Sequence, residues 1–265
     1  MRIPLFQVDA FSGRAFGGNP AAVALLEAWL PDATLQAIAA ENNLSETAYL
    51  VPHDADYELR WFTPEMEVDL CGHATLAAGK IVLDELRAGQ DLVRFDSRSG
   101  PLAVRRTGEL FELDFPAQPG EPVDISPALV EAMGREPNEV WRSVHYDLLV
   151  YETEDDVAGL SPDEARLVAL EPALGIIASA PGDSAAGVDF VSRFFAPKAG
   201  IFEDPVTGSA HCVSTPYWAE RLGKERLEAR QISRRGGELT CTLRGDRVAI
   251  AGRATLFLRG EIELE

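Results

Sequence analysis

Cysteine is scarce in this sequence, with three residues in 265, and no two of them form a Cys-x-x-Cys pair. Three is also an odd number, whereas a disulfide framework pairs its cysteines. The sequence therefore indicates neither a disulfide framework nor a zinc knuckle. We assign Cys212 and Cys241 to the hydrophobic core.

Long apolar runs and basic clusters are missing as well. No stretch reaches the roughly 18 consecutive apolar residues that a membrane-spanning helix needs, and residues 1–4 lead into a strand-like pattern rather than a signal peptide. Asp and Glu number 43 against 24 Lys and Arg, so the net charge is −19. That charge opposes binding to nucleic-acid phosphates and mainly favours solubility. We therefore expect a cytoplasmic protein that binds neither membranes nor nucleic acid.

The motifs of nucleotide cofactors are absent too. No glycine-rich loop carries a Walker lysine, and the pair Gly17-Gly18 is followed by Asn19-Pro20 rather than by a helix, as a Rossmann pattern would require. The sequence therefore predicts no nucleotide cofactor.

The most informative stretch that is present covers residues 67–78, where a polar loop turns through Gly72 into small and apolar residues. The apolar character continues to Leu83 without a polar face, which is typical of a helix buried inside a domain. The unpaired N–H groups of its first turn, together with the helix dipole, would form a site for an anion such as a substrate carboxylate.

This stretch has a counterpart at residues 202–213. Gly72 and Gly208 are 136 residues apart, Pro64 and Pro197 are 133 apart, and residues 30–32 resemble residues 161–163 at an offset of 131. Three matches in the same order at a nearly constant offset predict a duplicated domain. We expect an N-terminal lobe over residues 1–118 and a C-terminal lobe over 119–265, with a linker in the proline-rich tract 116–123.

Apolar spacing and turn residues predict a mixed α+β fold, in which each lobe is a sheet around one buried helix. Strands are predicted at 3–9, 21–26, 44–51, 57–62, 91–95, 101–106, 110–115, 144–152, 174–179, 188–195, 228–233, 238–243, 247–251 and 254–264. Helices are predicted at 31–42, 162–169, after the loop within 67–87, and at 209–222, after a loop at 202–208. Pro216 lies inside the last helix and is expected to bend it.

These helix starts also bear on metal binding. Cys71, His73, His211 and Cys212 lie near the two starts, but His73 follows its glycine by one residue and His211 by three. A helical turn of about 100° per residue aims the two imidazoles differently. We therefore expect no metal site.

Four motifs in order resemble the PhzF-like family of phenazine-biosynthesis isomerases. They are Gly-Asn-Pro-Ala-Ala-Val (18–23), Asn-Leu-Ser-Glu-Thr-Ala (43–48), Asp-Leu-Cys-Gly-His-Ala-Thr-Leu-Ala (69–77) and Glu-Asp-Pro-Val-Thr-Gly-Ser-Ala (203–210). The resemblance covers nearly the whole chain. It implies the diaminopimelate epimerase-like fold: two pseudo-symmetric lobes, each a barrel-like sheet around a central helix, with the site in the cleft between them.

The resemblance implies that Glu46, in the Ser-Glu-Thr segment, is the general acid/base. A carboxylate beside Leu44, Ala48 and Tyr49 should lose solvation in a closed cleft, which would raise its pKa. Such a group can take a proton from one carbon and return it at another. The alternative for any single glutamate is a solvated surface residue.

The same resemblance assigns roles to His73, Asp204 and Ser209. His73 follows Gly72 at a helix start, where the dipole disfavours the imidazolium, so we expect a neutral hydrogen-bonding group or proton relay. Asp204 would assist at a hydroxyl or amino group of the substrate. The amides near Gly72, His73, Gly208 and Ser209 would hold its carboxylate. The alternatives are a structural His73, and helix caps for Asp204 and Ser209.

One departure separates the chain from the racemases of this fold, which place a cysteine before each of the two glycines. Cys71 occupies the first position, but Thr207 occupies the second. A two-thiol racemase mechanism is therefore not expected, and Cys71 is interpreted as a small buried packing residue.

The sequence thus predicts a cofactor-independent isomerase, in which Glu46 shifts a proton within a small carboxylated, conjugated substrate resembling a dihydro-hydroxyanthranilate. Two alternatives stay open: an epimerase or racemase with different bases, and a non-catalytic carboxylate-binding protein. The fold class leads us to expect a homodimer.

Overall fold

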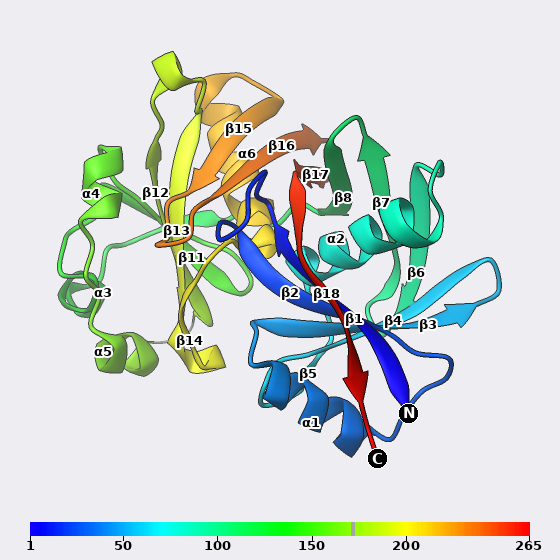
Figure 1. Cartoon of the computed structure of the whole chain (residues 1–265). Helices are drawn as coiled ribbons and strands as arrows, with labels where there is room; N and C mark the ends of the chain where they lie inside the picture. The colour runs from blue at the N-terminus through cyan, green and yellow to red at the C-terminus, as the bar shows by residue number, and fades with distance from the viewer. Residues whose placement is uncertain (171–172) are drawn as a thin grey trace. The chain divides into compact units, whose positions relative to one another are not determined.

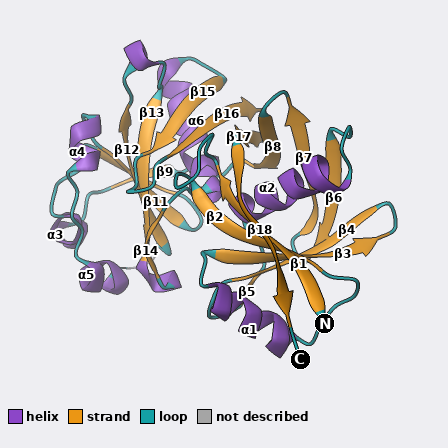
Figure 2. Cartoon of the chain, viewed as in Figure 1, coloured by secondary structure: helices purple, strands orange, loops and turns teal. Residues whose placement is uncertain are grey.

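The structure is a computed structural model that describes residues 1–170 and 173–265. It is a mixed α+β fold in which strands predominate (Figures 1 and 2). The α+β prediction is thereby confirmed. The chain divides into two compact units: unit 1 comprises Met1–Asp114 and Ala251–Glu265, and unit 2 comprises Phe115–Ile250.

This division differs from the predicted lobes, 1–118 and 119–265, in the place of the C-terminal strand. Strand β18 (Ala254–Glu263) pairs antiparallel with β1 (Arg2–Ala10), so the two ends of the chain share one sheet in unit 1. Ile3, opposite Ile262, is buried in the core of that unit, and Leu264 packs against the same core. The C-terminal strand β18 is thus held against the N-terminal strand β1 by backbone pairing and by apolar contacts.

Unit 1 holds the remaining strands of the first half of the chain. They are β2 (Asn19–Leu25), β3 (Glu46–His53), β4 (Asp56–Phe62), β5 (Glu67–Val68), β6 (Leu92–Ser97), β7 (Gly100–Thr107) and β8 (Leu110–Pro116). Strands β1 and β2 pair antiparallel, β2 and β3 parallel, and β3 and β4 antiparallel. Strand β4 then pairs antiparallel with β5 and parallel with β6, and β6, β7 and β8 continue antiparallel.

Helix α2 (Gly72–Ile81) is the buried helix of unit 1. It packs against β1, β2, β3 and β7 (Figure 1), and all its residues except Gly72 and Lys80 are buried. Small side chains permit this close packing: a Cβ atom added at Gly79 would lie 2.4 Å from Val104 Cγ1. A π-helical turn, η1 (Val82–Leu86), continues the helix. Helix α1 (Asp32–Asn42) instead buries Leu35 and Ile38 against a separate core that contains Tyr49.

Among the described residues, unit 2 contains strands β9 to β16 and most of β17. Their bounds are β9 (Glu121–Val123), β10 (Glu139–Arg142), β11 (Tyr146–Val150), β12 (Gly175–Pro181), β13 (Phe190–Ala196), β14 (Ile201–Asp204), β15 (Arg226–Gln231), β16 (Gly237–Arg244) and β17 (Arg247–Gly252). The helices are α3 (Pro127–Met133), α4 (Glu154–Ala158), α5 (Glu164–Ala169) and α6 (Gly208–Leu222), with 3₁₀ turns η2 (Ser184–Ala186) and η3 (Pro197–Ala199).

The pairing pattern of unit 2 repeats that of unit 1. Strands β10 and β11 pair antiparallel, β11 and β12 parallel, and β12 and β13 antiparallel. Strand β13 then pairs antiparallel with β14 and parallel with β15, as β4 does with β5 and β6. Helix α6 follows β14 as α2 follows β5, and it packs against β11, β12, β15 and β16. This shared topology supports the predicted duplication.

Several local expectations need correction. The predicted linker 116–123 contains strand β9, which pairs with β10, and the predicted loop 202–208 begins as strand β14. Helices α3 and α4 were not expected from apolar spacing because each is short. Both have capped starts: Ser126 accepts a hydrogen bond from Leu129 N, and Thr153 forms a capping box with Asp156.

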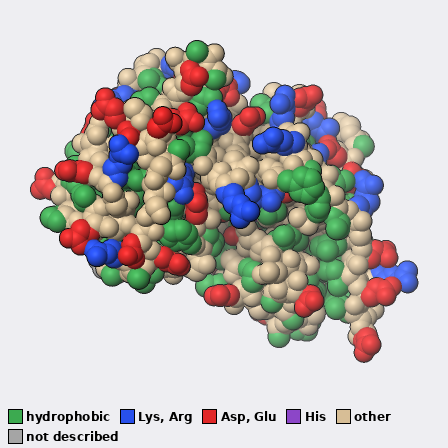
Figure 3. Space-filling view, turned by 60° about the vertical axis from the view of Figure 1, so that its left-hand side comes forward, with side chains coloured by type: hydrophobic (Ala, Val, Ile, Leu, Met, Phe, Trp, Pro, Cys, Tyr) green, Lys and Arg blue, Asp and Glu red, His purple; other side chains and the backbone are tan. Residues whose placement is uncertain are grey.

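Within the described residues, no helix combines the length and apolar character that crossing a membrane requires. On the face shown in Figure 3, acidic and basic side chains are interspersed. The excess of negative charge is therefore not gathered into one patch on that face.

Candidate active site

Glu46 and His73 form a close pair inside unit 1. Glu46 is the first residue of β3, and His73 is the second residue of α2. Glu46 Oε2 lies 2.9 Å from His73 Nε2, and the two residues are only 8% and 5% exposed. The interpretation of Glu46 as a solvated surface residue is therefore wrong. Strand β2 pairs with both β1 and β3, and α2 packs on all three, which brings these residues together.

The contact between the two side chains is close but poorly aligned. Neither Glu46 Oε2 nor His73 Nε2 has a hydrogen-bond partner of good geometry among the described residues, and both atoms are buried. A buried polar atom without a partner costs about 1–3 kcal/mol. Catalytic hydrogen bonds are often misaligned before the substrate binds. Both atoms are thus available to a third group, such as a substrate proton.

The other nitrogen of the His73 ring faces a different set of partners. Nδ1 lies 3.2 Å from Asn19 Nδ2 and 3.5 Å from Cys71 Sγ. The hydroxyl of Ser45 donates in turn to Asn19 Oδ1 over 3.0 Å. A polar chain therefore runs from Ser45 through Asn19 to His73 and ends at Glu46.

The protonation of His73 reflects opposing influences. Burial alone lowers the pKa of the imidazole, but Cys71 and Glu46 outweigh burial and raise the pKa above its ordinary value. The sequence predicts a neutral ring from the helix dipole alone. Glu46, whose position beside the ring is set by the fold, acts in the opposite direction.

Cys71 is the residue before α2 and is buried. Burial, followed by the nearby Glu46 charge, raises the pKa of its thiol to about 11. The side chain is therefore a neutral thiol at physiological pH, a poor base and a poor nucleophile. This agrees with its interpretation as a packing residue.

The structure also brings together three possible metal ligands, and this set differs from the one considered in the sequence. One donor atom each from Glu46, Cys71 and His73 lies within 4.8 Å of the others. However, Cys71 contacts Nδ1 of the ring and Glu46 contacts Nε2. An ion on the lone pair of either nitrogen would have one of the two other ligands on the far side of the ring. The arrangement suits a hydrogen-bonded relay better than a metal centre.

The start of α2 lies beside this pair. The helix begins at Gly72, as predicted, and its N-cap Cys71 makes no side-chain capping bond. Its first N–H groups therefore lack the usual side-chain acceptor and favour an anion.

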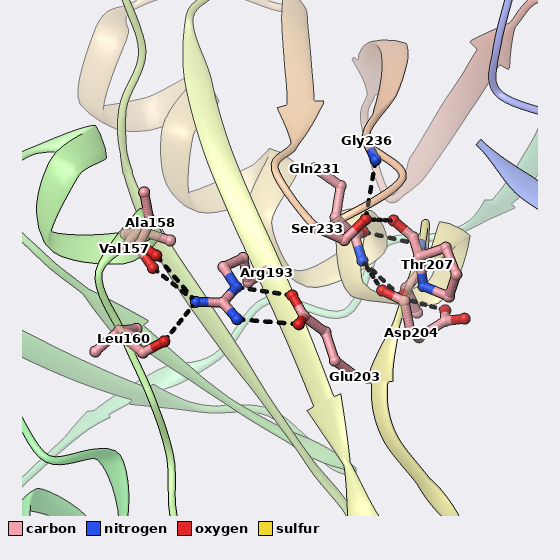
Figure 4. A network of polar contacts seen from close by, with 11 residues as sticks. Val157, Ala158, Leu160, Arg193, Glu203, Asp204, Thr207, Gln231, Ser233 and Gly236 are labelled. Carbon is pink, nitrogen blue, oxygen red and sulfur yellow. Dashed lines mark hydrogen bonds and ion pairs between the residues drawn. The ribbon is translucent and has the colours of Figure 1, made fainter. Parts of the chain in front are cut away.

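Asp204, the third predicted catalytic residue, lies in unit 2 at the end of β14. Its carboxylate accepts a hydrogen bond from the hydroxyl of Thr207. Gln231 Nε2 donates to Asp204 O over 2.7 Å and to Thr207 Oγ1 over 3.2 Å, and Gln231 Oε1 accepts from Thr207 N over 2.9 Å (Figure 4). All three side chains are buried. The network fixes the direction of the Asp204 carboxylate.

A second set of polar contacts fixes strand β14, which carries both Glu203 and Asp204. Arg193 on β13 forms a bidentate ion pair with Glu203, with Nε 2.7 Å from Oε1. It also donates to the carbonyls of Val157 in α4 and of Leu160 just after that helix (Figure 4). Bidentate Arg–carboxylate pairs are among the stronger polar contacts. Glu203, the residue next to Asp204, is thereby anchored to β13.

Ser209 and Gly208 begin helix α6. The N-cap of that helix is Thr207, again without a side-chain capping bond. The cap interpretation of Asp204 and Ser209 is therefore wrong. The hydroxyl of Ser209 is 3.1 Å from that of Tyr146, whose pKa is raised by burial. His211 Nδ1 donates to Thr207 O over 2.8 Å, which fixes this imidazole inside the unit.

The structure thus gathers the predicted residues into two groups: Glu46, Gly72 and His73 in unit 1, and Asp204, Gly208 and Ser209 in unit 2. Sequence reasoning did not assign roles to the residues that position them. Asn19 and Ser45 each lie inside a motif, which was the available signal. Gln231 and Tyr146 carried none, because each reaches the site only through strand pairing.

Comparisons with known proteins show the family and the fold of this chain. The family model PhzC-PhzF, described as phenazine biosynthesis-like protein, matches residues 8–260. An uncharacterized isomerase of Pseudomonas aeruginosa is 51% identical over 264 residues, covering 100% of both chains. The crystal structure of a PhzF-family phenazine biosynthesis protein from Enterococcus faecalis superposes with a TM-score of 0.96 at 48% identity, covering 100% of both chains. A predicted epimerase from Pseudomonas aeruginosa shares the fold, with a TM-score of 0.73 at 23% identity and 99% coverage of both chains.

Proposed function

Because this chain belongs to the PhzC-PhzF family of phenazine biosynthesis-like proteins and is an isomerase, we propose that it moves a proton within a small carboxylated, conjugated substrate. A dihydro-hydroxyanthranilate is the substrate type that we favour, and we propose that no cofactor takes part. The observation that carries the proposal is the buried pair of Glu46 Oε2 and His73 Nε2, 2.9 Å apart and without aligned partners.

The proposed reaction needs one acid/base group at a time. Glu46 takes a proton from a carbon next to the conjugated system, the electron pair moves along that system, and the proton returns at another carbon. No atom is gained or lost, so the reaction is an isomerisation. His73 lies against the carboxylate and stabilises its charge before Glu46 takes the proton and again after Glu46 returns it; between the two steps Glu46 is a neutral acid and the negative charge lies on the conjugated substrate.

The carboxylate of the substrate needs a separate binding site. We assign it to the amides near Gly72 and His73 at the start of α2, and to those near Gly208 and Ser209 at the start of α6. Both helices begin without a side-chain capping bond, which supports this assignment. Asp204, oriented by Thr207 and Gln231, would bind a hydroxyl or amino group of the substrate.

The epimerase alternative has support from the shared fold but not from the side chains. A racemase of this fold would need a thiol where Thr207 stands, and Thr207 instead donates to Asp204. The thiol of Cys71 is held neutral by burial. A purely carboxylate-binding protein would have no use for the buried and poorly satisfied Glu46–His73 pair, which destabilises the fold.

Product analysis in heavy water tests the proposal. The enzyme would be incubated with a dihydro-hydroxyanthranilate and with a panel of small carboxylated amines and amino acids, and the products followed by NMR. We expect deuterium at a carbon that carried no exchangeable hydrogen in the substrate, together with a shifted double bond. Deuterium confined to an α-carbon, with inversion there, would replace the isomerase by the epimerase.

We also propose that the chain is a cytoplasmic homodimer, the state common in this fold class. Light scattering during gel filtration should give twice the 28.8 kDa mass of the chain. A single-chain mass at micromolar concentration would contradict the dimer without affecting the reaction proposed above.

A further inference from the structure

We propose that Asn19, held by Ser45, is a positioning residue that places the ring proton of His73 on Nε2, facing Glu46. The inference rests on the proposed function for its kinetic consequence, because it concerns the same acid/base pair. Its structural part stands on the contacts of unit 1 alone.

The backbone around Asn19 is rigidly placed. Asn19 is the first residue of β2, is fully buried, and pairs with Ala10 of β1. The preceding residue, Gly18, has φ +64°, and a Cβ atom there would lie 2.0 Å from Ala10 O. Only glycine fits this turn without a clash. The position of the Asn19 amide beside the His73 ring is therefore set by the start of β2 and its pairing with β1.

Two of the contacts made by the Asn19 side chain indicate the orientation of its amide. The hydroxyl of Ser45 donates to Asn19 Oδ1, so the carbonyl end of the amide faces Ser45 and the N–H₂ end faces His73 Nδ1. An amide N–H₂ group is only a donor, and a ring nitrogen that receives its hydrogen bond cannot itself carry a proton.

Cys71 lies against the same ring nitrogen, Nδ1, and can also donate a hydrogen bond to it. Its neutral thiol lies 3.5 Å from Nδ1, and its S–H group can donate to a ring nitrogen that has a free lone pair. Nδ1 thus faces the N–H₂ group of Asn19 and a thiol that is able to donate to the same lone pair. When the ring carries one proton, that proton belongs on Nε2, 2.9 Å from the Glu46 carboxylate.

This arrangement gives His73 a defined task. An Nε2–H group 2.9 Å from Glu46 Oε2 can share its hydrogen with the carboxylate once the two groups align, whereas a lone pair facing Glu46 would repel the ionised carboxylate. The identity of the partner on one imidazole nitrogen commonly decides the state of the other. Asn19 would therefore affect catalysis without touching the substrate.

The isosteric change Asn19→Asp reverses the polarity of the contact and tests the inference. A carboxylate at this position accepts a hydrogen bond, so it should draw the proton to Nδ1 and leave Nε2 without one. The ring ¹⁵N signals of His73, assigned by their loss in His73→Gln, report which nitrogen is protonated. In the wild type at a pH where the ring holds one proton, we expect a protonated Nε2 and a bare Nδ1.

In Asn19→Asp we expect kcat to fall by about 10- to 100-fold, with KM changed much less. Changes to residues that orient a metal-bound histidine through its other ring nitrogen have effects of this size. Ser45→Ala, which frees the amide to rotate, should show a smaller fall and a mixture of the two ring forms. Asn138→Asp is the matched control: the same isosteric change at an exposed amide on unit 2, which should alter neither the ¹⁵N signals nor kcat.

The wild-type spectrum alone can overturn the inference: a proton on Nδ1 in the singly protonated ring would contradict it. Unchanged His73 signals in a folded Asn19→Asp variant would do so as well. Because the spectra need no substrate, failure of the proposed reaction and failure of this inference are distinguishable. If Asn19→Asp does not fold, Ser45→Ala and the wild type still decide the question.

Discussion

At the scale of single residues, environment decides which of two neighbouring side chains can do acid/base chemistry. Cys71 and His73 are two positions apart and both are buried. Burial makes the thiol a poor base by raising its pKa to about 11, whereas the lowering of the imidazole pKa by burial is outweighed by its neighbours Cys71 and Glu46. Residue type alone would rank the cysteine as the stronger candidate, and its surroundings reverse that order.

The substitution Cys71→Ala tests this ranking. Because the thiol is neutral and only assists at Nδ1 of His73, we expect kcat within about tenfold of the wild type, small beside the 10²–10⁴-fold that a general base contributes. Steady-state rates with the substrate found in the heavy-water screen would give the value. A loss of about 10³-fold or more, in a variant with unchanged thermal stability, would show that Cys71 takes the proton itself.

At the scale of elements, the tight packing of the two central helices, α2 and α6, fixes the positions of the candidate site residues at their starts. Helix α2 approaches β7 so closely at Gly79 that a methyl group has no space beside Val104. Helix α6 buries His211 completely, with the ring hydrogen-bonded to Thr207 O at the first turn. The helix starts that we assign to substrate binding therefore rest on rigid supports.

Gly79→Ala should destabilise the protein by about 1–3 kcal/mol, the usual cost of overpacking a core. Val104→Ala should remove the clash, so the double variant should be more stable than the sum of the two single changes predicts, by about 1 kcal/mol or more. Urea unfolding of the four proteins gives the coupling. Strict additivity would show that α2 does not press on β7 at this point.

His211 predicts how stability depends on pH. Burial lowers the pKa of its imidazole to about 4 from an ordinary value of 6.5, so the unfolded chain takes up a proton before the folded one does. Stability is therefore complete above pH 6.5 and is lost as the pH falls toward 4, by roughly 3 kcal/mol at 1.36 kcal/mol per unit.

Unfolding free energies at several pH values, compared between the wild type and His211→Asn, would isolate this contribution. The asparagine amide can replace the bond from Nδ1 to Thr207 O, so the variant should fold and should lose less stability between pH 6.5 and 4. His145→Asn, at an exposed histidine, is the control and should follow the wild type. Parallel curves for His211→Asn and the wild type would contradict the assignment.

The sequence predicted these elements unevenly, for identifiable reasons. The start at Gly72 could be found because mostly small and apolar residues follow it as far as Leu83, and the start at Gly208 because the stretch around it resembles the stretch around Gly72. Strand β14 was read as a loop because Glu203 and Asp204 interrupt its apolar pattern. The contact of Asn19 with His73 spans 54 positions. No local pattern encodes such a contact, since it arises from the register of β1, β2 and β3.

At the scale of the whole molecule, the chain is two copies of one topology, with its last strand returned to the first unit. The sequence indicated the duplication through repeated glycines, prolines and short motifs. It did not indicate that β18 pairs with β1, because strand partners far apart in sequence leave no periodic signal. The division at residue 118 followed from the proline-rich tract alone.

Removal of residues 254–265 tests how far the pairing of β18 with β1 stabilises unit 1. Without β18, strand β1 loses the backbone partners that run from Ala254 to Glu263, and the core around Ile3 becomes exposed. We expect unit 1 to unfold, visible as rapid proteolysis within residues 1–114, whereas deletion of Glu265 alone should have no effect. A truncated chain that retains the wild-type melting temperature would show that the N-terminal segment is stable without its C-terminal partner.

The central claim is that Glu46 moves the proton, and its most direct test is the rate of hydrogen exchange into product by Glu46→Gln. Glutamine keeps the shape of the side chain but cannot act as a base, so deuterium incorporation from heavy water should fall by on the order of 10²–10⁴-fold. Glu41→Gln, at an exposed position on α1, should match the wild type. Exchange by a folded Glu46→Gln at the wild-type rate would contradict the account.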